Sequence, residues 1–175
     1  MVHSLEQHHG VSEGWGIPLG GLVWPRPYFP TRAERALVIS QSLPGWAIAG
    51  AHTAGWVWTG MGYPSPWAVL RQEYPGLSPL ERSAWRARLH SPRHQRLEQL
   101  GPLRVLDPQS CATDILLHTA NIDAGATQLL FLHPSSSSPM LQLEGRRASV
   151  AQHQHAEKIC QRWRWLRKTY LDITR

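Results

Sequence analysis

The chain has 175 residues, which is enough for one well-buried domain and too few for two full ones. Its 18 Lys and Arg residues outnumber its 12 Asp and Glu residues, giving a formal net charge of +6 at pH 7. The two cysteines, Cys111 and Cys160, lie far apart without a CxxC partner, which argues against a zinc ribbon and a disulfide framework. No apolar run is long enough to cross a bilayer, so we expect a cytoplasmic protein without membrane contact.

Glycines and prolines crowd the first thirty residues, with five glycines before position 22 and three prolines between 25 and 30. Such a density of residues that interrupt helices and strands predicts an extended, irregular arm. We therefore divide the chain into an N-terminal arm at 1–30 and a single domain at 31–175.

Two helices are predicted at the start of this domain. Thr31 is a suitable N-cap because Glu34 follows three residues later, and the helix should end before Pro44. A second helix, rich in small residues, is predicted to begin near His52 and to end at Gly60, since glycine is the usual residue at a helix C-terminus.

The next segment admits two interpretations. Residues 85–90 alternate apolar and basic side chains, which predicts a half-exposed strand whose outer face carries Arg86, Arg88 and His90. Alternatively, a helix begins after Ser78 with Pro79 at its first position. The pattern leaves both interpretations open.

Strands are also predicted at 67–71, after a proline-rich turn, and at 103–106. Asp107 then supplies a capping oxygen and Pro108 occupies the first helical position, which predicts a helix continuing to Leu117.

The C-terminal third is predicted to contain a strand at 126–132, a flexible serine-rich loop at 135–139 and a long helix at 151–170. The order of elements predicts an α/β (α+β) domain with a short mixed sheet, the N-terminal arm and a long C-terminal helix.

Within that last helix, cations alternate with tryptophans between Arg162 and Lys168. Guanidinium and ammonium groups neutralise phosphates and indoles stack on bases, so this segment favours nucleic acid, most simply DNA, as a partner. The alternative is that Trp163, Leu166 and Tyr170 form a buried stripe and the cations its solvated face. The candidate nucleic-acid-binding residues are Arg86, Arg88, Arg93, Arg162, Arg164, Arg167 and Lys168.

The sequence gives little support for a metal centre or a catalytic site. Pro92 separates His90 from His94, and His153 and His155 point to different sides of a helix, so neither pair has the spacing of zinc ligands. No phosphate-binding glycine loop is present. An enzyme would need a cleft joining Asp114, a histidine and a cysteine, which no pattern indicates, so we predict a protein without catalytic residues, metal or cofactor.

Two segments, 47–60 and 101–116, resemble the AbiEi-like antitoxins of type IV toxin–antitoxin systems and their actinobacterial relatives. The first is similar to a helix of small residues ending in an aromatic and glycine, the second to a strand whose Asp-Pro turn opens a helix with a leucine-flanked aspartate. The resemblance implies a transcriptional regulator that binds its promoter and opposes a toxin protein. Family members usually carry an N-terminal winged helix, which the arm before Thr31 does not match, so DNA contact would have to come from the basic residues above.

Two functional hypotheses follow. The first is a non-enzymatic, antitoxin-like regulator that contacts nucleic acid through an arginine-rich surface, with binding that weakens steeply as salt rises. The alternative is a protein–protein interaction module that binds a partner, or a second copy of itself, through exposed tryptophans. The candidate interface residues are Trp56, Trp58, Trp163 and Trp165.

Overall fold

The computed structural model describes residues 16–19, 22–25, 30–62, 66–73, 76–85, 87–133, 138–143 and 148–173. In these ranges the helices are α2 (Arg32–Ser42), α3 (Ala51–Thr59), α4 (Pro79–Trp85), α5 (Pro108–His118), α6 (Ile122–Leu132) and α7 (Val150–Ile173), with a 3-10 helix, η1 (Pro139–Leu143). The strands are β1 (Gly16–Leu19), β2 (Leu22–Pro25), β3 (Ile48–Ala49), β4 (Val69–Arg71), β5 (Arg88–Leu89), β6 (Leu97–Leu100) and β7 (Leu103–Leu106).

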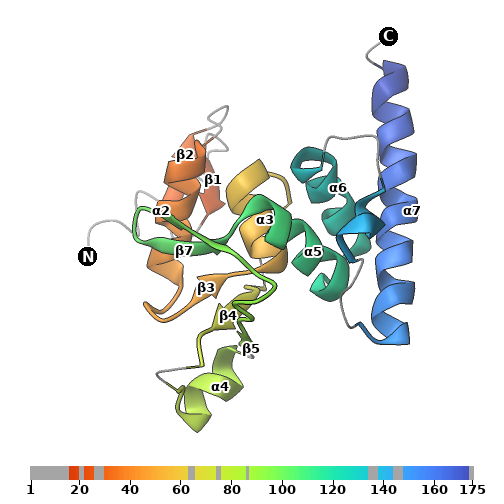
Figure 1. Ribbon diagram of the computed structural model, residues 1–175. Coiled ribbons are helices and arrows are strands. Elements are labelled where there is room, and N and C mark those ends of the chain that lie inside the picture. The colour runs from red at the N-terminus through yellow and green to blue at the C-terminus, as the bar shows by residue number, and fades with distance from the viewer. Residues whose placement is uncertain are drawn as a thin grey trace.

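The main sheet has the strand order β5-β4-β3-β7-β6 and is mixed. β3 pairs in parallel with β7, and β4 with β5, whereas β3–β4 and β6–β7 are antiparallel. Figure 1 shows α5, α6 and α7 beside one another on one side of the molecule, with α3 between them and the sheet. The predicted α+β class, with its short mixed sheet and long C-terminal helix, is confirmed.

The core lies where the sheet meets α3 and α5. Strand residues Ile48, Leu70 and Val105 are fully buried, as are Ile115 on α5 and Ile159 on α7. Burying aliphatic side chains of this size contributes about 1.5–3 kcal/mol each, so α7 is held to the body by apolar packing along its inner face.

The predicted helix boundaries set by capping are confirmed. Thr31 donates its backbone N–H to Glu34 Oε2 at 2.8 Å and accepts the Glu34 N–H on its hydroxyl, so α2 begins with a capping box. α3 ends at Gly60, whose φ of +73° favours glycine. Asp107 caps α5 through the N–H of Ser110 at 2.6 Å.

Both interpretations of the segment before His90 are partly correct. α4 is followed directly by the short strand β5, and the edge-on contact of Trp85 with Trp46, 6.3 Å between ring centroids, holds α4 near the sheet. The prediction that Arg88 and His90 face outward is wrong, because Arg88 turns toward a buried carboxylate and His90 is itself buried. Arg86 lies outside the described residues.

The strand predicted at 126–132 is wrong, since this segment is part of α6. Asn121 caps the helix by accepting the Ala124 N–H on its side-chain oxygen at 3.0 Å. This capping residue, which indicates a helix, precedes the apolar segment 126–132 in the sequence. A short apolar run cannot by itself distinguish a buried helix from a strand.

The N-terminal part differs from the irregular arm that the sequence predicts. β1 and β2 form an antiparallel two-stranded sheet, in which Gly16 is opposite Pro25 and Leu19 is opposite Leu22. Residues 1–15 lie outside the described residues, as do positions 135–137 of the predicted serine-rich loop, whereas Pro139 begins η1. None of the described helices has an apolar stretch long enough to span a membrane.

Candidate functional site

The outer face of α7 carries a concentration of positive charge. Its inner face is formed by residues buried against the other helices, Ala156, Ile159, Cys160 and Trp163. On the opposite side the side chains of Lys158, Gln161, Arg164, Trp165 and Lys168 are exposed, and we call these five residues the α7 outer face. The sequence between Lys158 and Tyr170 has no acidic residue, while the exposed Glu157 lies directly before this stretch, on the same side of the helix as Gln161, Arg164 and Lys168.

Trp165 lies on this outer face with 54% of its surface exposed. The guanidinium of Arg162 lies 4.2 Å from the centre of the Trp165 ring, so the two side chains make a cation–π contact. Arg162 also donates from Nε to Asp123 Oδ1 at 2.6 Å, so its charge is partly balanced. An exposed indole among cations is the geometry that the alternating Arg-Trp pattern predicts.

The other predicted interface tryptophans are in different environments. Trp56 and Trp163 are 4% and 2% exposed, so the prediction that they form an exposed interface is wrong. Trp58 is half-buried and donates from Nε1 to the Leu106 carbonyl at 2.7 Å. The buried stripe expected on α7 includes Trp163 but ends before Tyr170, which is exposed. The guanidinium of Arg167 lies 5.4 Å from the centre of the Trp163 ring.

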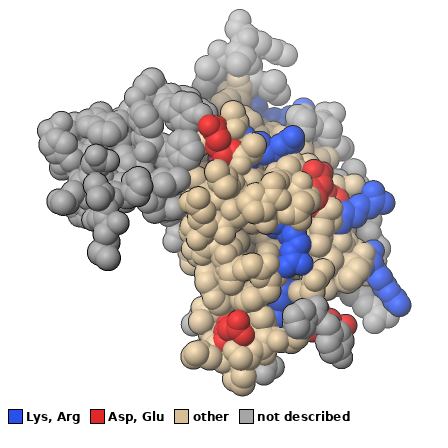
Figure 2. Space-filling model, turned by 90° about the vertical axis from the view of Figure 1, so that its left-hand side faces the viewer, with Lys and Arg blue, Asp and Glu red and all other residues tan. Residues whose placement is uncertain are grey.

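The basic residues near the sheet edge do not form a uniform positive surface. Arg93 is exposed in the β5–β6 connection, whereas Arg88 is turned inward. On the face drawn in Figure 2, basic side chains lie in the middle and toward the right, and acidic side chains lie among them. Of the two candidate basic regions, the α7 outer face is the one in which three exposed cations, Lys158, Arg164 and Lys168, lie along a single helix.

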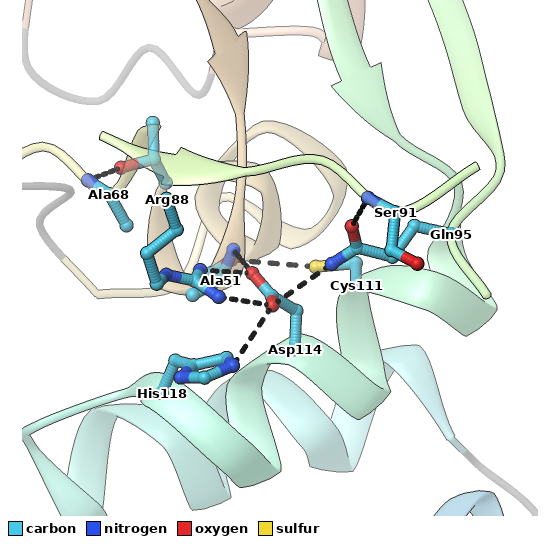
Figure 3. A network of polar contacts seen from close by, with 9 residues as sticks. Ala51, Ala68, Arg88, Ser91, Gln95, Cys111, Asp114 and His118 are labelled. Atoms are coloured by element: carbon cyan, nitrogen blue, oxygen red, sulfur yellow. Dashed lines mark hydrogen bonds and ion pairs between the residues drawn. The ribbon is translucent and has the colours of Figure 1, made fainter. Parts of the chain in front are cut away.

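A second polar site surrounds the buried carboxylate of Asp114 on α5, which is only 2% exposed (Figure 3). Arg88 on β5 makes a bidentate ion pair with it, Nη1 to Oδ1 at 2.8 Å and Nη2 to Oδ2 at 2.6 Å. The N–H of Ala51 donates to Oδ2 at 2.8 Å, and Gln95 Nε2 donates to Oδ1 at 3.3 Å. One carboxylate thus joins β5, α3, α5 and the β5–β6 connection.

The start of α3 is shaped around this carboxylate. Ala51 has a φ of +34°, an unfavourable value for a residue with a side chain, and its N–H is aimed at Asp114. A Cβ at the preceding residue, Gly50, would lie 3.1 Å from Asp114 Oδ2 and 3.0 Å from the Leu70 side chain. The close approach therefore favours glycine at position 50.

A cavity of about 510 Å³ opens beside this network. It is lined by Arg88, Leu89, Ser91, His94, Gln95, Ser110, Thr113, Asp114, Leu117 and His118. His118, one helical turn after Asp114, places Nε2 3.9 Å from Oδ1. Burial and then the charge of Arg88 lower the pKa of His118, so its imidazole is neutral at pH 7 and can donate one hydrogen bond.

From the sequence, Asp114 was considered as a requirement of an enzyme and as the leucine-flanked aspartate of segment 101–116, but its neighbours Arg88, Gln95 and His118 were not predicted. The structure brings Asp114 and a histidine to one cavity, but Cys111 is fully buried with its Sγ 3.5 Å from the Ala51 carbonyl. Among the described residues, no group of three His, Cys, Asp or Glu side chains is placed to hold a metal ion.

Both thiols are expected to be unreactive in the folded protein. Burial raises the pKa of Cys111 well above its usual value and raises that of Cys160 to about 11, and the thiolate is the reactive form. We expect Ellman's reagent to label neither cysteine of the native protein at pH 8 and to label both in guanidinium chloride. Rapid labelling of one thiol without denaturant would contradict the burial of these side chains.

No model of a known protein family, no curated protein and no solved structure matches this chain. Segments 47–60 and 101–116 contain two strand–helix units, β3–α3 and β7–α5, which β4, α4, β5 and β6 separate in the chain and whose strands pair in parallel. The Asp114–Ala51 hydrogen bond joins the two units directly. The two segments are therefore neighbours in the structure, although residues 61–100 separate them in the sequence.

Proposed function

We propose that this protein is a non-enzymatic, antitoxin-like regulator that contacts DNA through the α7 outer face. The observation that carries the proposal is the exposed Trp165 indole placed among Arg164, Lys168 and Lys158 on one side of a helix. Cations neutralise backbone phosphates, and an indole adds a flat surface for sugar or base contacts.

The shape of α7 supports this role. Figure 1 shows the helix at the outer edge of the molecule, with its C-terminal turns extending beyond α6. Because its inner face is buried against the core up to Trp163, the outer face is held rigidly and remains accessible. A rigid helix presenting several cations contacts phosphates at a lower entropic cost than a mobile basic tail.

The resemblance to AbiEi-like antitoxins adds the biological role: binding upstream of its own gene and opposing a partner toxin. A winged helix is not carried over, so contact through α7 would be chiefly with the DNA backbone. We expect modest sequence preference and strong dependence on salt.

The test is a fluorescence-anisotropy titration with a labelled generic duplex and with the chain's own upstream region, across a salt series. We expect log affinity to fall linearly with log salt concentration, and the double variant Arg164→Ala, Lys168→Ala to reduce the slope by about 2, since each lost phosphate contact removes about one unit. Tighter binding to the upstream region would support autoregulation.

The matched control is Arg93→Ala with Arg96→Ala, which removes the same charge from the exposed β5–β6 connection. If this control weakens binding as much as the α7 variant, the contact is not specific to α7. No binding at low salt would refute the proposal.

A protein interface is the second candidate, because Trp165 and Tyr170 are both large, exposed aromatic side chains on α7. It predicts association that persists at high salt and is lost in Trp165→Ala. Analytical ultracentrifugation at low and high salt separates the two functions.

A further inference from the structure

The cavity beside Asp114 contains a carboxylate whose hydrogen-bonding capacity is already used. Oδ1 accepts from Arg88 and Gln95, and Oδ2 accepts from Arg88 and the Ala51 N–H. The negative charge is also balanced by the Arg88 guanidinium. The carboxylate therefore has little capacity left to attract a cation or a hydrogen-bond donor.

The remaining polar groups of the cavity are mainly donors. A guanidinium has more N–H groups than the bidentate pair with Asp114 uses. Ser110 accepts the Arg96 N–H on its hydroxyl oxygen at 2.8 Å, which leaves its own proton to donate. His94 and His118 also line the cavity, and an imidazole can donate through a ring N–H. The Arg88 guanidinium, which can only donate, favours a ligand that carries hydrogen-bond acceptors.

The cavity is also partly apolar and too large for a simple ion. Its volume of about 510 Å³ is in the range of pockets that hold small organic molecules, and Leu89 and Leu117 contribute apolar wall. In Figure 3, Arg88 and His118 approach Asp114 from different elements, so the donors are grouped around the carboxylate.

We propose that this cavity binds a small organic oxyanion, whose phosphate or carboxylate group accepts hydrogen bonds from Arg88, His94 and His118 while its body lies against Leu89 and Leu117. The site lies on α5, β5 and the β5–β6 connection and does not include the α7 outer face, so it is independent of DNA binding. Arg88 would then serve two anions at once, Asp114 within the chain and the ligand outside it.

The test is isothermal titration of the full chain, at constant ionic strength, with phenyl phosphate, benzoate, inorganic phosphate and benzyl alcohol. We expect phenyl phosphate or benzoate to bind, more tightly than inorganic phosphate, and benzyl alcohol not to bind. Which of the two aryl oxyanions binds better distinguishes a phosphate ligand from a carboxylate. Equal binding of benzyl alcohol, or no binding of either aryl oxyanion, would overturn the proposal.

Variants locate the site. His94 is exposed and its backbone N–H donates to the Ser91 carbonyl at 3.0 Å, a bond that alanine keeps, so His94→Ala should fold normally. Combined with His118→Ala, it should weaken binding about tenfold or more, because hydrogen bonds to charged groups are strong. The control Arg93→Ala removes a full charge one residue away, from a side chain that does not line the cavity, and should change affinity less than about twofold. Unchanged binding by the double histidine variant would also overturn the proposal.

Discussion

Replacing Asp114 with alanine is expected to lower the free energy of unfolding by about 3 kcal/mol, because removing one partner of a buried ion pair leaves the other charge uncompensated. Arg88 keeps 31% of its side chain exposed, which places the loss at the lower end of the usual range for buried pairs. The Ala51 N–H would also lose its acceptor. Urea denaturation followed by circular dichroism measures the change.

Asp123→Ala is the matched control, since Asp123 also meets an arginine, Arg162, at 2.6 Å. Its side chain is 72% exposed, and exposed ion pairs contribute about 0–1 kcal/mol. We therefore expect a much smaller loss than for Asp114→Ala. Equal losses in the two variants would contradict the view that burial, not the ion-pair distance, decides the contribution of these carboxylates.

Gly55→Ala is expected to destabilise the protein by about 2 kcal/mol, although alanine in a helix interior is normally about 1 kcal/mol more favourable than glycine. A Cβ at position 55 would lie 2.3 Å from Gln128 Oε1 on α6. The Gln128 side chain cannot move away freely, because it is fully buried and its Nε2 donates to the carbonyls of His52 and Met61, each at 2.9 Å. Urea denaturation shows directly whether Gly55→Ala lowers or raises the free energy of unfolding.

A double-mutant cycle tests whether the contact with Gln128 causes the destabilisation by Gly55→Ala. In a Gln128→Ala background the clash is absent, so Gly55→Ala should become neutral or stabilising. Gly45→Ala is the control for a glycine with open space, since nothing lies within 4 Å of a Cβ there, and it should change stability by less than about 0.5 kcal/mol. A Gly55→Ala variant that is stabilised in the native background would contradict the close contact of α3 with α6.

The sequence predicted elements best where local chemistry fixes a boundary. The capping residues Thr31 and Asp107 and the terminal Gly60 act on their own helices, so their effect is visible in a few consecutive residues. The segment 126–132 lacked such a signal within itself, because the cap that makes it a helix is Asn121, five residues earlier. The strand β3 is only two residues long and its pairing depends on β4 and β7, which no local pattern shows.

The Asp114 site was hidden from sequence analysis for a different reason. Arg88 and Asp114 are 26 residues apart, and alternation alone placed Arg88 on the solvent side of its strand. One signal was present: Asp114 is the only charged residue between Cys111 and Leu117, in a stretch that is otherwise apolar or small. A lone carboxylate in such a helix has to find a cation or several N–H donors, and that requirement predicts a polar site even when its partners are unknown.

The position of β7 within the sheet has a consequence for the order of folding during synthesis. β7 lies between β3 and β6, although it follows both in the chain, and α5 supplies the acceptor for the first N–H of α3. A nascent chain that ends before Leu103 therefore holds β3 with one edge unpaired, and a chain that ends before Asp114 holds α3 without the acceptor of its first N–H. We expect most strands of the sheet to leave the ribosome before the sheet is stable, so folding should be a late step. Because that step depends on contacts between residues far apart in the sequence, it should be slower than the folding of helical proteins of the same length.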